Sequence, residues 1–106
     1  MAKIAKHIED PITLKVRTQV NQGIMQALEA KGFTVYFDYS IDINNNANLT
    51  ICYLDKYSKD GNRHILIEGK SSWNEEKDVQ NWKYARAVAF ERAYETYLKY
   101  IKQEAF

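Results

Sequence analysis

Four side chains in the middle of the chain are of the types that bind zinc: Asp38, Cys52, Asp55 and His64. Zinc takes three or four nitrogen, sulfur or oxygen ligands that converge at about 2.0–2.3 Å on one point. The chain has no Cys-x-x-Cys or His-x-x-x-His pair, so a site would need His7 or a further carboxylate brought in from elsewhere. We therefore expect no metal or other cofactor and an ordinary strand histidine at position 64, with zinc kept as the alternative.

A second candidate for chemistry is Glu68-Gly69-Lys70, whose Glu-x-Lys spacing resembles the motif of metal-dependent nucleases of the PD-(D/E)xK type. The resemblance implies that Glu68, with Asp38 or Asp42, would hold a divalent ion and that Lys70 would position or activate water. The Pro-Asp half of the motif is absent, and a charged rim on a solvated sheet face is the favoured interpretation. No other arrangement typical of nucleophilic catalysis or phosphate binding is present, so we expect a protein that is not an enzyme and has no catalytic residue.

The element that would position these side chains is a long helix predicted over residues 75–102. Ala85, Ala89 and Ala93 follow one another at i, i+4 and i+8, a row that lets a helix backbone approach a flat partner closely. Trp82 and Tyr97 share that face. This helix should therefore have one broad buried face with a sheet beneath it.

A second helix is predicted over residues 11–31. Asp10 is a good N-cap, Pro11 suits the first helical position, and Gly32 suits the left-handed residue after a helix. Apolar side chains recur at helical spacing, which predicts the buried stripe Val16, Val20, Ile24, Ala27 and Leu28.

Apolar and polar residues alternate over 33–43, 49–57 and 63–70, which predicts three strands separated by an asparagine-rich turn and an Asp60-Gly61 turn. The order is α-β-β-β-α, so we expect an α+β fold with a three-stranded antiparallel meander and both helices on one face. The 106 residues suit one domain, in which 1–9 form an N-terminal arm or a short helix.

The register follows if odd-numbered residues face the helices in all three strands. Both loops then have five residues, with Ile43 opposite Leu49 and Tyr57 opposite Arg63. The outer face becomes an apolar centre ringed by charge, which is typical of a contact surface. The predicted partner-binding residues are Tyr36, Asp38, Leu54, Lys56, His64 and Leu66. Covering of this face by the N-terminal arm or by a homodimer is the alternative.

The element order and the segment KYARAVAFERAY, which begins at Lys83, resemble the double-stranded-RNA-binding domain. Lys83, Arg86, Ala89 and Ala93 fall on or near the positions of that family's alanine-rich second helix. That family presents a lysine cluster to phosphates at the start of this helix, whereas residues 74–78 here read Asn-Glu-Glu-Lys-Asp. The resemblance therefore implies the fold without the activity, and RNA or DNA binding is the alternative function.

The net charge of the chain also argues against nucleic-acid binding. The formal net charge is only +1, whereas a dedicated duplex binder carries a large positive excess. A single cysteine excludes an internal disulfide, and the N-terminus lacks the apolar core of a signal peptide. We expect a cytoplasmic protein.

A small, tyrosine- and asparagine-rich chain without a catalytic signature resembles, as a class, phage-encoded inhibitors of host defence, including anti-CRISPR proteins. The resemblance implies surface blockade of a host nucleic-acid enzyme such as an RNA-guided nuclease, through about 800 Å² of surface per partner. The expected function is that of a viral, protein-binding inhibitor or adaptor that acts in the host cytoplasm.

Overall fold

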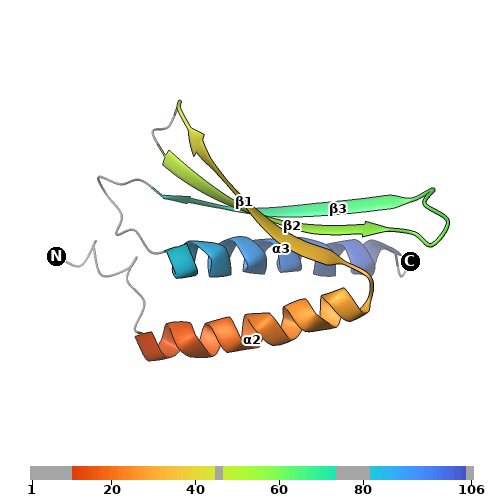
Figure 1. Cartoon of the computed structure of the whole chain (residues 1–106), viewed down its shortest axis with the longest axis horizontal. Helices are drawn as coiled ribbons and strands as arrows, with labels where there is room; N and C mark the ends of the chain where they lie inside the picture. The colour runs from red at the N-terminus through yellow and green to blue at the C-terminus, as the bar shows by residue number, and fades with distance from the viewer. Residues whose placement is uncertain (1–10, 45–46, 74–81, 105–106) are drawn as a thin grey trace.

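The computed structural model describes residues 11–44, 47–73 and 82–104. The elements are α2 (Pro11–Ala30), β1 (Thr34–Asp42), β2 (Ala47–Tyr57), β3 (His64–Trp73) and α3 (Trp82–Glu104). The predicted α+β fold with the order α-β-β-β-α is confirmed (Figure 1). The predicted N-terminal arm and the predicted first turns of the last helix, at 75–81, lie outside the described residues.

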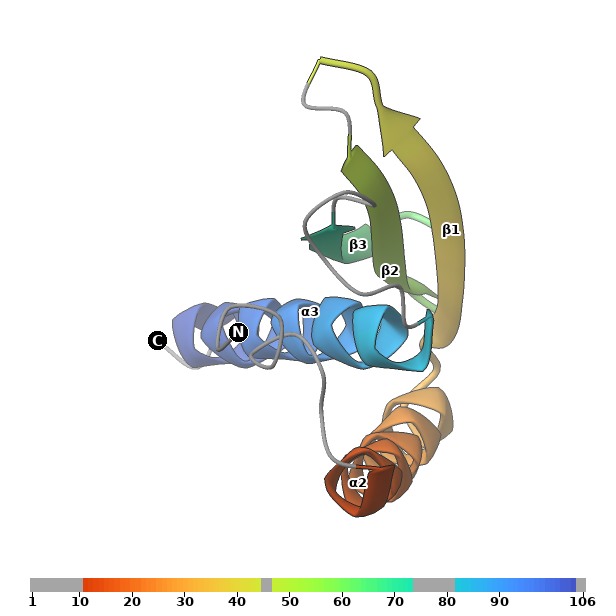
Figure 2. The same ribbon diagram turned by 90° about the vertical axis from the view of Figure 1, so that its left-hand side faces the viewer.

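The three strands form one open antiparallel sheet in the order β1-β2-β3. Helix α3 lies along one face of this sheet and covers β2 and β3, while α2 packs against α3 and β1 (Figures 1 and 2). Neither helix of the described chain combines the length and apolarity that crossing a bilayer requires.

The predicted close approach of α3 to the sheet is confirmed at Gly69. A methyl group built at Gly69 would lie closer than 3.0 Å to the backbone of Ala89 and Ala93. Ala85, Ala89 and Ala93 are all buried, so the row of small residues lets the helix backbone rest directly on β3. The contact needs a residue without a side chain on one surface and methyl groups on the other.

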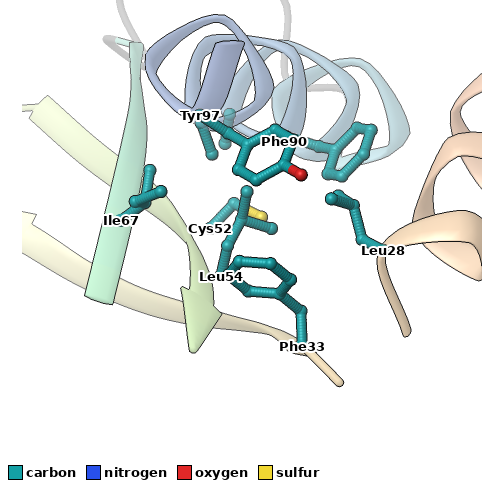
Figure 3. Packing of buried hydrophobic residues seen from close by; sticks show 9 residues of the cluster. Leu28, Phe33, Cys52, Leu54, Ile67, Phe90 and Tyr97 are labelled. Carbon is teal, nitrogen blue, oxygen red and sulfur yellow. The ribbon is translucent and has the colours of Figure 1, made fainter. Parts of the chain in front are cut away.

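The core lies between α3 and the sheet and is closed at one end by α2 (Figure 3). Phe90 and Leu54 are fully buried at its centre. Phe33, which directly precedes β1, packs edge-on against Tyr97 of α3 with 5.4 Å between ring centroids. The cluster comprises Leu28, Phe33, Cys52, Leu54, Ile67, Ala89, Phe90, Ala93 and Tyr97.

The predicted register is wrong for β2. Odd residues of β1 pair with even residues of β2, as in Val35 with Leu54, and even residues of β2 pair with odd residues of β3, as in Leu54 with Ile67. The even-numbered side chains of β2 therefore face the helices, and three of them, Thr50, Cys52 and Leu54, have no exposed surface. In β1 and β3 the predicted faces are correct.

The physical reason for this error is that both loops are even. Asp42 pairs with Ala47, so four residues, 43–46, separate β1 from β2. Ser58 and Arg63 still pair through a backbone hydrogen bond of 2.8 Å, which leaves Lys59 to Asn62 as an even-numbered loop. The loop contains a tight turn in which the Gly61 N–H donates a hydrogen bond to the Ser58 carbonyl. Gly61 has φ of 75°, in the left-handed region that favours glycine. An even loop places an odd residue opposite an even one and inverts the parity of the next strand.

The predicted buried stripe of α2 is correct only in part. Leu28 is buried and Ile24 packs against the core, as predicted, but Val16 and Val20 are more than half exposed. Leu14 and Asn21, which were not predicted, are buried. The buried Asn21 amide donates a hydrogen bond of 3.0 Å to Glu91 of α3, which also accepts two bonds from the Arg17 guanidinium. Partial burial raises the pKa of the Glu91 carboxyl, but the bonds from Arg17 and Asn21 and the charge of Arg17 outweigh it and lower the pKa overall.

We predict that Cys52 does not react with an aromatic disulfide reagent at neutral pH while the chain is folded. Burial raises the pKa of its thiol to about 12, an effect that the nearby Arg86 charge only partly offsets, and no surface of Cys52 is exposed. Absorbance of the released thiolate should report no labelling until guanidinium chloride unfolds the chain. A Ser72→Cys variant is the control, because that exposed position should react at once. Fast labelling of Cys52 in the folded wild type would contradict the inward orientation of β2.

Candidate functional site

The structure divides the six predicted partner-binding residues between the two faces of the sheet. Four lie on the face turned away from the helices, namely Tyr36, Asp38, His64 and Leu66. Leu54 is fully buried in the core and cannot contact a partner, which corrects the prediction. Lys56 is also on the helix side, where its ammonium lies 5.5 Å from the Phe33 ring centroid. Both corrections have one cause, the inverted parity of β2.

Odd-numbered residues of β2 take the places that sequence reasoning gave to Leu54 and Lys56. These residues are Ile51, Tyr53, Asp55 and Tyr57. We call the surface formed by Tyr36, Asp38, Ile51, Tyr53, Asp55, Tyr57, His64, Leu66, Glu68 and Lys70 the outer face. The signal for the missed residues was present in the sequence, because β2 carries two tyrosines at odd positions and two apolar residues, Cys52 and Leu54, at even positions.

Aromatic rings pack in pairs across neighbouring strands of the outer face. Tyr36 of β1 stacks on Tyr53 of β2 with 5.0 Å between centroids. Tyr57 of β2 stacks on the His64 imidazole with 4.1 Å between centroids and an interplanar angle of 4°. Tyr36 and Tyr57 nonetheless remain 41% and 61% exposed, so each stack presents an open ring to solvent.

Asp55 holds one of the two stacks in place. Its carboxylate lies 2.5 Å from His64 Nε2, and because a carboxylate only accepts, the imidazole donates this bond. Desolvation and the negative charge of Asp55 raise the pKa of the Tyr36 phenol. The Asp55 carboxylate therefore orients the His64 ring of β3, and its charge also acts on Tyr36 of β1.

Charge on the outer face is predominantly acidic. Asp38, Asp55 and Glu68 lie on it, against one lysine, Lys70, whose ammonium is 3.5 Å from Glu68. Leu66 is 51% exposed and supplies an apolar contact beside Asp55, its partner on the next strand across the sheet. The surface thus combines aromatic rings, one aliphatic side chain and negative charge.

The structure brings together neither the predicted zinc ligands nor the predicted nuclease residues. Cys52 points into the core while His64, Asp38 and Asp55 point outward, so the zinc candidates are divided by the sheet. Within residues 11–44, 47–73 and 82–104, no group of three or more histidine, cysteine, aspartate and glutamate side chains is placed to hold a metal ion. His7, the further ligand considered for zinc, lies outside this part of the chain.

Neither of the carboxylates predicted to complete the Glu-x-Lys motif, Asp38 and Asp42, lies next to Glu68. Glu68 and Lys70 face outward as predicted, but they form an ion pair with each other. Asp38 lies opposite Ile51, which in turn lies opposite Lys70, so it is two strands from the pair, a distance of about 10 Å. The arrangement is that of a charged rim on an exposed sheet edge.

A hollow of about 680 Å³ lies on the other side of the molecule, between α2, α3 and β1. Leu14, Met25 and Phe37 supply apolar lining, and the Arg86 guanidinium lies 4.8 Å from the Phe37 ring centroid. Lys15 and Lys83 are exposed at its margin. This hollow is therefore lined by positive charge, in contrast to the acidic outer face.

No protein-family model matches this chain, and searches of curated proteins and of solved structures found no match.

Proposed function

We propose that this protein is a non-enzymatic binding module that docks a protein partner through its outer face. The observation that carries the proposal is the open sheet face with its two stacked aromatic pairs and the exposed Leu66. Tyrosine is enriched at protein interfaces, where a large amphipathic ring adds contact area at little cost in side-chain entropy.

The contacts that already hold these rings favour this use of them. A side chain that is already held in one conformation loses less entropy when a partner covers it. His64 is hydrogen-bonded to Asp55, and Tyr36 and His64 are each stacked on a neighbouring ring. The outer face is therefore a preorganised surface rather than a set of independent side chains.

The charge of the outer face favours a protein over a nucleic acid at this surface. Asp38, Asp55 and Glu68 would repel a phosphate backbone, whereas a basic patch on a protein complements them. Surface blockade of an RNA-guided nuclease or another host defence enzyme is the form of inhibition we propose, because the phosphate-binding channels of such enzymes are basic.

The test is capture of partners by the immobilised full chain from host lysate, with identification by mass spectrometry and affinity measurement on the purified partner. The double substitution Tyr36→Ser with Leu66→Ser should weaken binding at least about tenfold, since loss of one interface hot spot costs 2 kcal/mol or more. Tyr39→Ser with Ile41→Ser is the matched control, because these exposed residues have similar chemistry on the opposite side of β1. Equal loss in both variants, or no loss in the first, would refute the assignment of the surface.

Nucleic-acid binding is the second candidate, and the hollow lined by Lys15, Lys83 and Arg86 is the observation that favours it. A duplex-RNA retention assay at two salt concentrations distinguishes the two functions, because a binder that neutralises phosphates shows a steep salt dependence. Lys83→Glu with Arg86→Glu should abolish such retention while leaving capture of a protein by the outer face unchanged. Divalent-ion-dependent cleavage that is lost in Glu68→Ala would instead support the nuclease alternative.

A further inference from the structure

Helix α2 has a continuous apolar strip along its exposed side. At about 100° per residue, six residues occupy an arc of about 80°, and none of them is polar or charged. All six are exposed: Ile12, Val16, Val20, Gly23, Ala27 and Ala30. We call this set the α2 strip. Ile12 is 73% exposed, Val16 53% and Val20 56%.

The α2 strip does not belong to the core of the domain. The opposite side of α2 carries the buried residues Leu14, Asn21 and Leu28, which pack toward α3 and β1. A methyl group built at Gly23 would meet no atom within 4 Å, so nothing in the described part of the chain covers the middle of the strip. A surface helix ordinarily places polar residues on its outward face, and an uncharged outward face therefore indicates a contact surface.

The strip continues into a shallow groove between the two helices. This groove has a volume of about 290 Å³, and Val20, Gly23 and Ala27 form one wall of it while Tyr94 and Tyr97 form the other. Leu98, one helical turn beyond Tyr94, is 41% exposed. The apolar surface is thus wider than a single helix, and α2, which carries most of it, lies on the other side of α3 from the sheet (Figures 1 and 2).

We propose that the α2 strip binds the α2 strip of a second copy of this chain, with the two helices antiparallel. Large residues occupy the N-terminal half of the strip and small residues the C-terminal half. Antiparallel pairing about a two-fold axis beside Val20 places Ile12 against Ala27 and Val16 against Gly23. Each large side chain then fills the space left by a small one. A parallel arrangement would instead place large residues against large and leave gaps along the small half.

The expected dimer is modest in affinity and depends on concentration. The helix has 20 residues and is therefore about 30 Å long, so the paired strips alone cover less than the roughly 800 Å² per partner of a standard interface. The groove residues and Leu98 add to that area at both ends by symmetry. Sedimentation velocity over a range of protein concentrations should give a mass that rises from 12.4 kDa toward twice that value.

The variant Val20→Glu should raise the dimer dissociation constant at least about tenfold, because two carboxylates would face each other near the two-fold axis without a partner. Gln22→Glu is the matched control, since it adds the same charge to an exposed position on another side of α2. Circular dichroism of both variants checks that the fold is retained. A wild-type chain that stays monomeric at every concentration, or a dimer that Val20→Glu leaves intact, would overturn the proposal.

Disulfide trapping tests the orientation. Val20→Cys should cross-link with itself, and a mixture of Ile12→Cys and Ala27→Cys chains should form a mixed dimer. Ile12→Cys alone should not cross-link, and the buried Cys52 should not compete. Efficient self-cross-linking of Ile12→Cys would indicate a parallel pair and would refute the arrangement proposed here.

Discussion

Replacing Gly69 with alanine is expected to destabilise this protein by about 3 kcal/mol or more, the upper part of the range for overpacking a core. The added methyl group would lie closer than 3.0 Å to the backbone nitrogen of Ala93 and to the carbonyl oxygen of Ala89. These are backbone atoms within a helix, so neither can move aside by changing a rotamer. The whole of α3 would have to lift from β3, and the core between them would lose contact. Urea denaturation followed by circular dichroism measures the loss.

Gly23→Ala is the matched control, measured at protein concentrations where the chain is monomeric, because the same chemical change then falls in open space. Gly23 lies inside α2, has no neighbour within 4 Å of the added methyl group, and gains helix propensity when replaced by alanine. We expect Gly23→Ala to raise the free energy of unfolding by up to about 1 kcal/mol. Opposite signs for the two substitutions would confirm the contact, whereas a stable Gly69→Ala protein would show that α3 does not rest on β3 as described.

The close contact at Gly69 also shows which part of the fold could be predicted from the sequence. The alanine row of α3 has few explanations other than close packing, and its spacing located the buried face of the helix correctly. The α-β-β-β-α order followed from clean changes between helical and alternating patterns. Such features are local, since spacing along one element determines them, and no knowledge of the neighbouring element is needed.

Which side chains of β2 face the helices could not be predicted in the same way. Cys52 and Leu54 at even positions are as apolar as Ile51 and Tyr53 at odd positions, so alternation did not distinguish the two sides. The choice then depended on loop length, and both loops are even: Asp42 pairs with Ala47, and Ser58 pairs with Arg63. These two pairings were not foreseen, and together they exchanged the two faces of β2 and moved Leu54 and Lys56 to the helix side of the sheet.

The buried stripe of α2 was predicted correctly at Ile24 and Leu28 and wrongly at Val16 and Val20, for a related reason. The helix has two apolar sides, and the side that is buried contains Asn21, whose polarity made the other side look like the core. Asn21 is tolerated there because Glu91, held by Arg17, accepts its hydrogen bond. That partner is 70 residues away along the chain, so spacing within α2 carried no information about it.

Leu54→Ala should lower the free energy of unfolding by about 2–5 kcal/mol, the range for truncating a buried leucine and leaving a cavity. Leu54 is fully buried at the centre of the core, where the Phe33 and Ile67 side chains lie in the same cluster (Figure 3). The effect is large because the surrounding rings and the backbone of β2 cannot collapse into the space. Guanidinium denaturation with linear extrapolation measures it.

Leu66→Ala is the control for this substitution, since it removes the same atoms one strand away on the other face. Leu66 is 51% exposed, so its truncation should cost about 0.5 kcal/mol or less, while it should weaken partner binding by the outer face. The two leucines were predicted from the sequence to be equivalent contact residues. We expect Leu54→Ala to lose stability while its folded fraction still binds the partner. We expect Leu66→Ala to keep its stability and lose binding. That pair of results would distinguish the core face of the sheet from its outer face. Similar stability losses at both positions would instead require that the outer face is itself covered in the native protein.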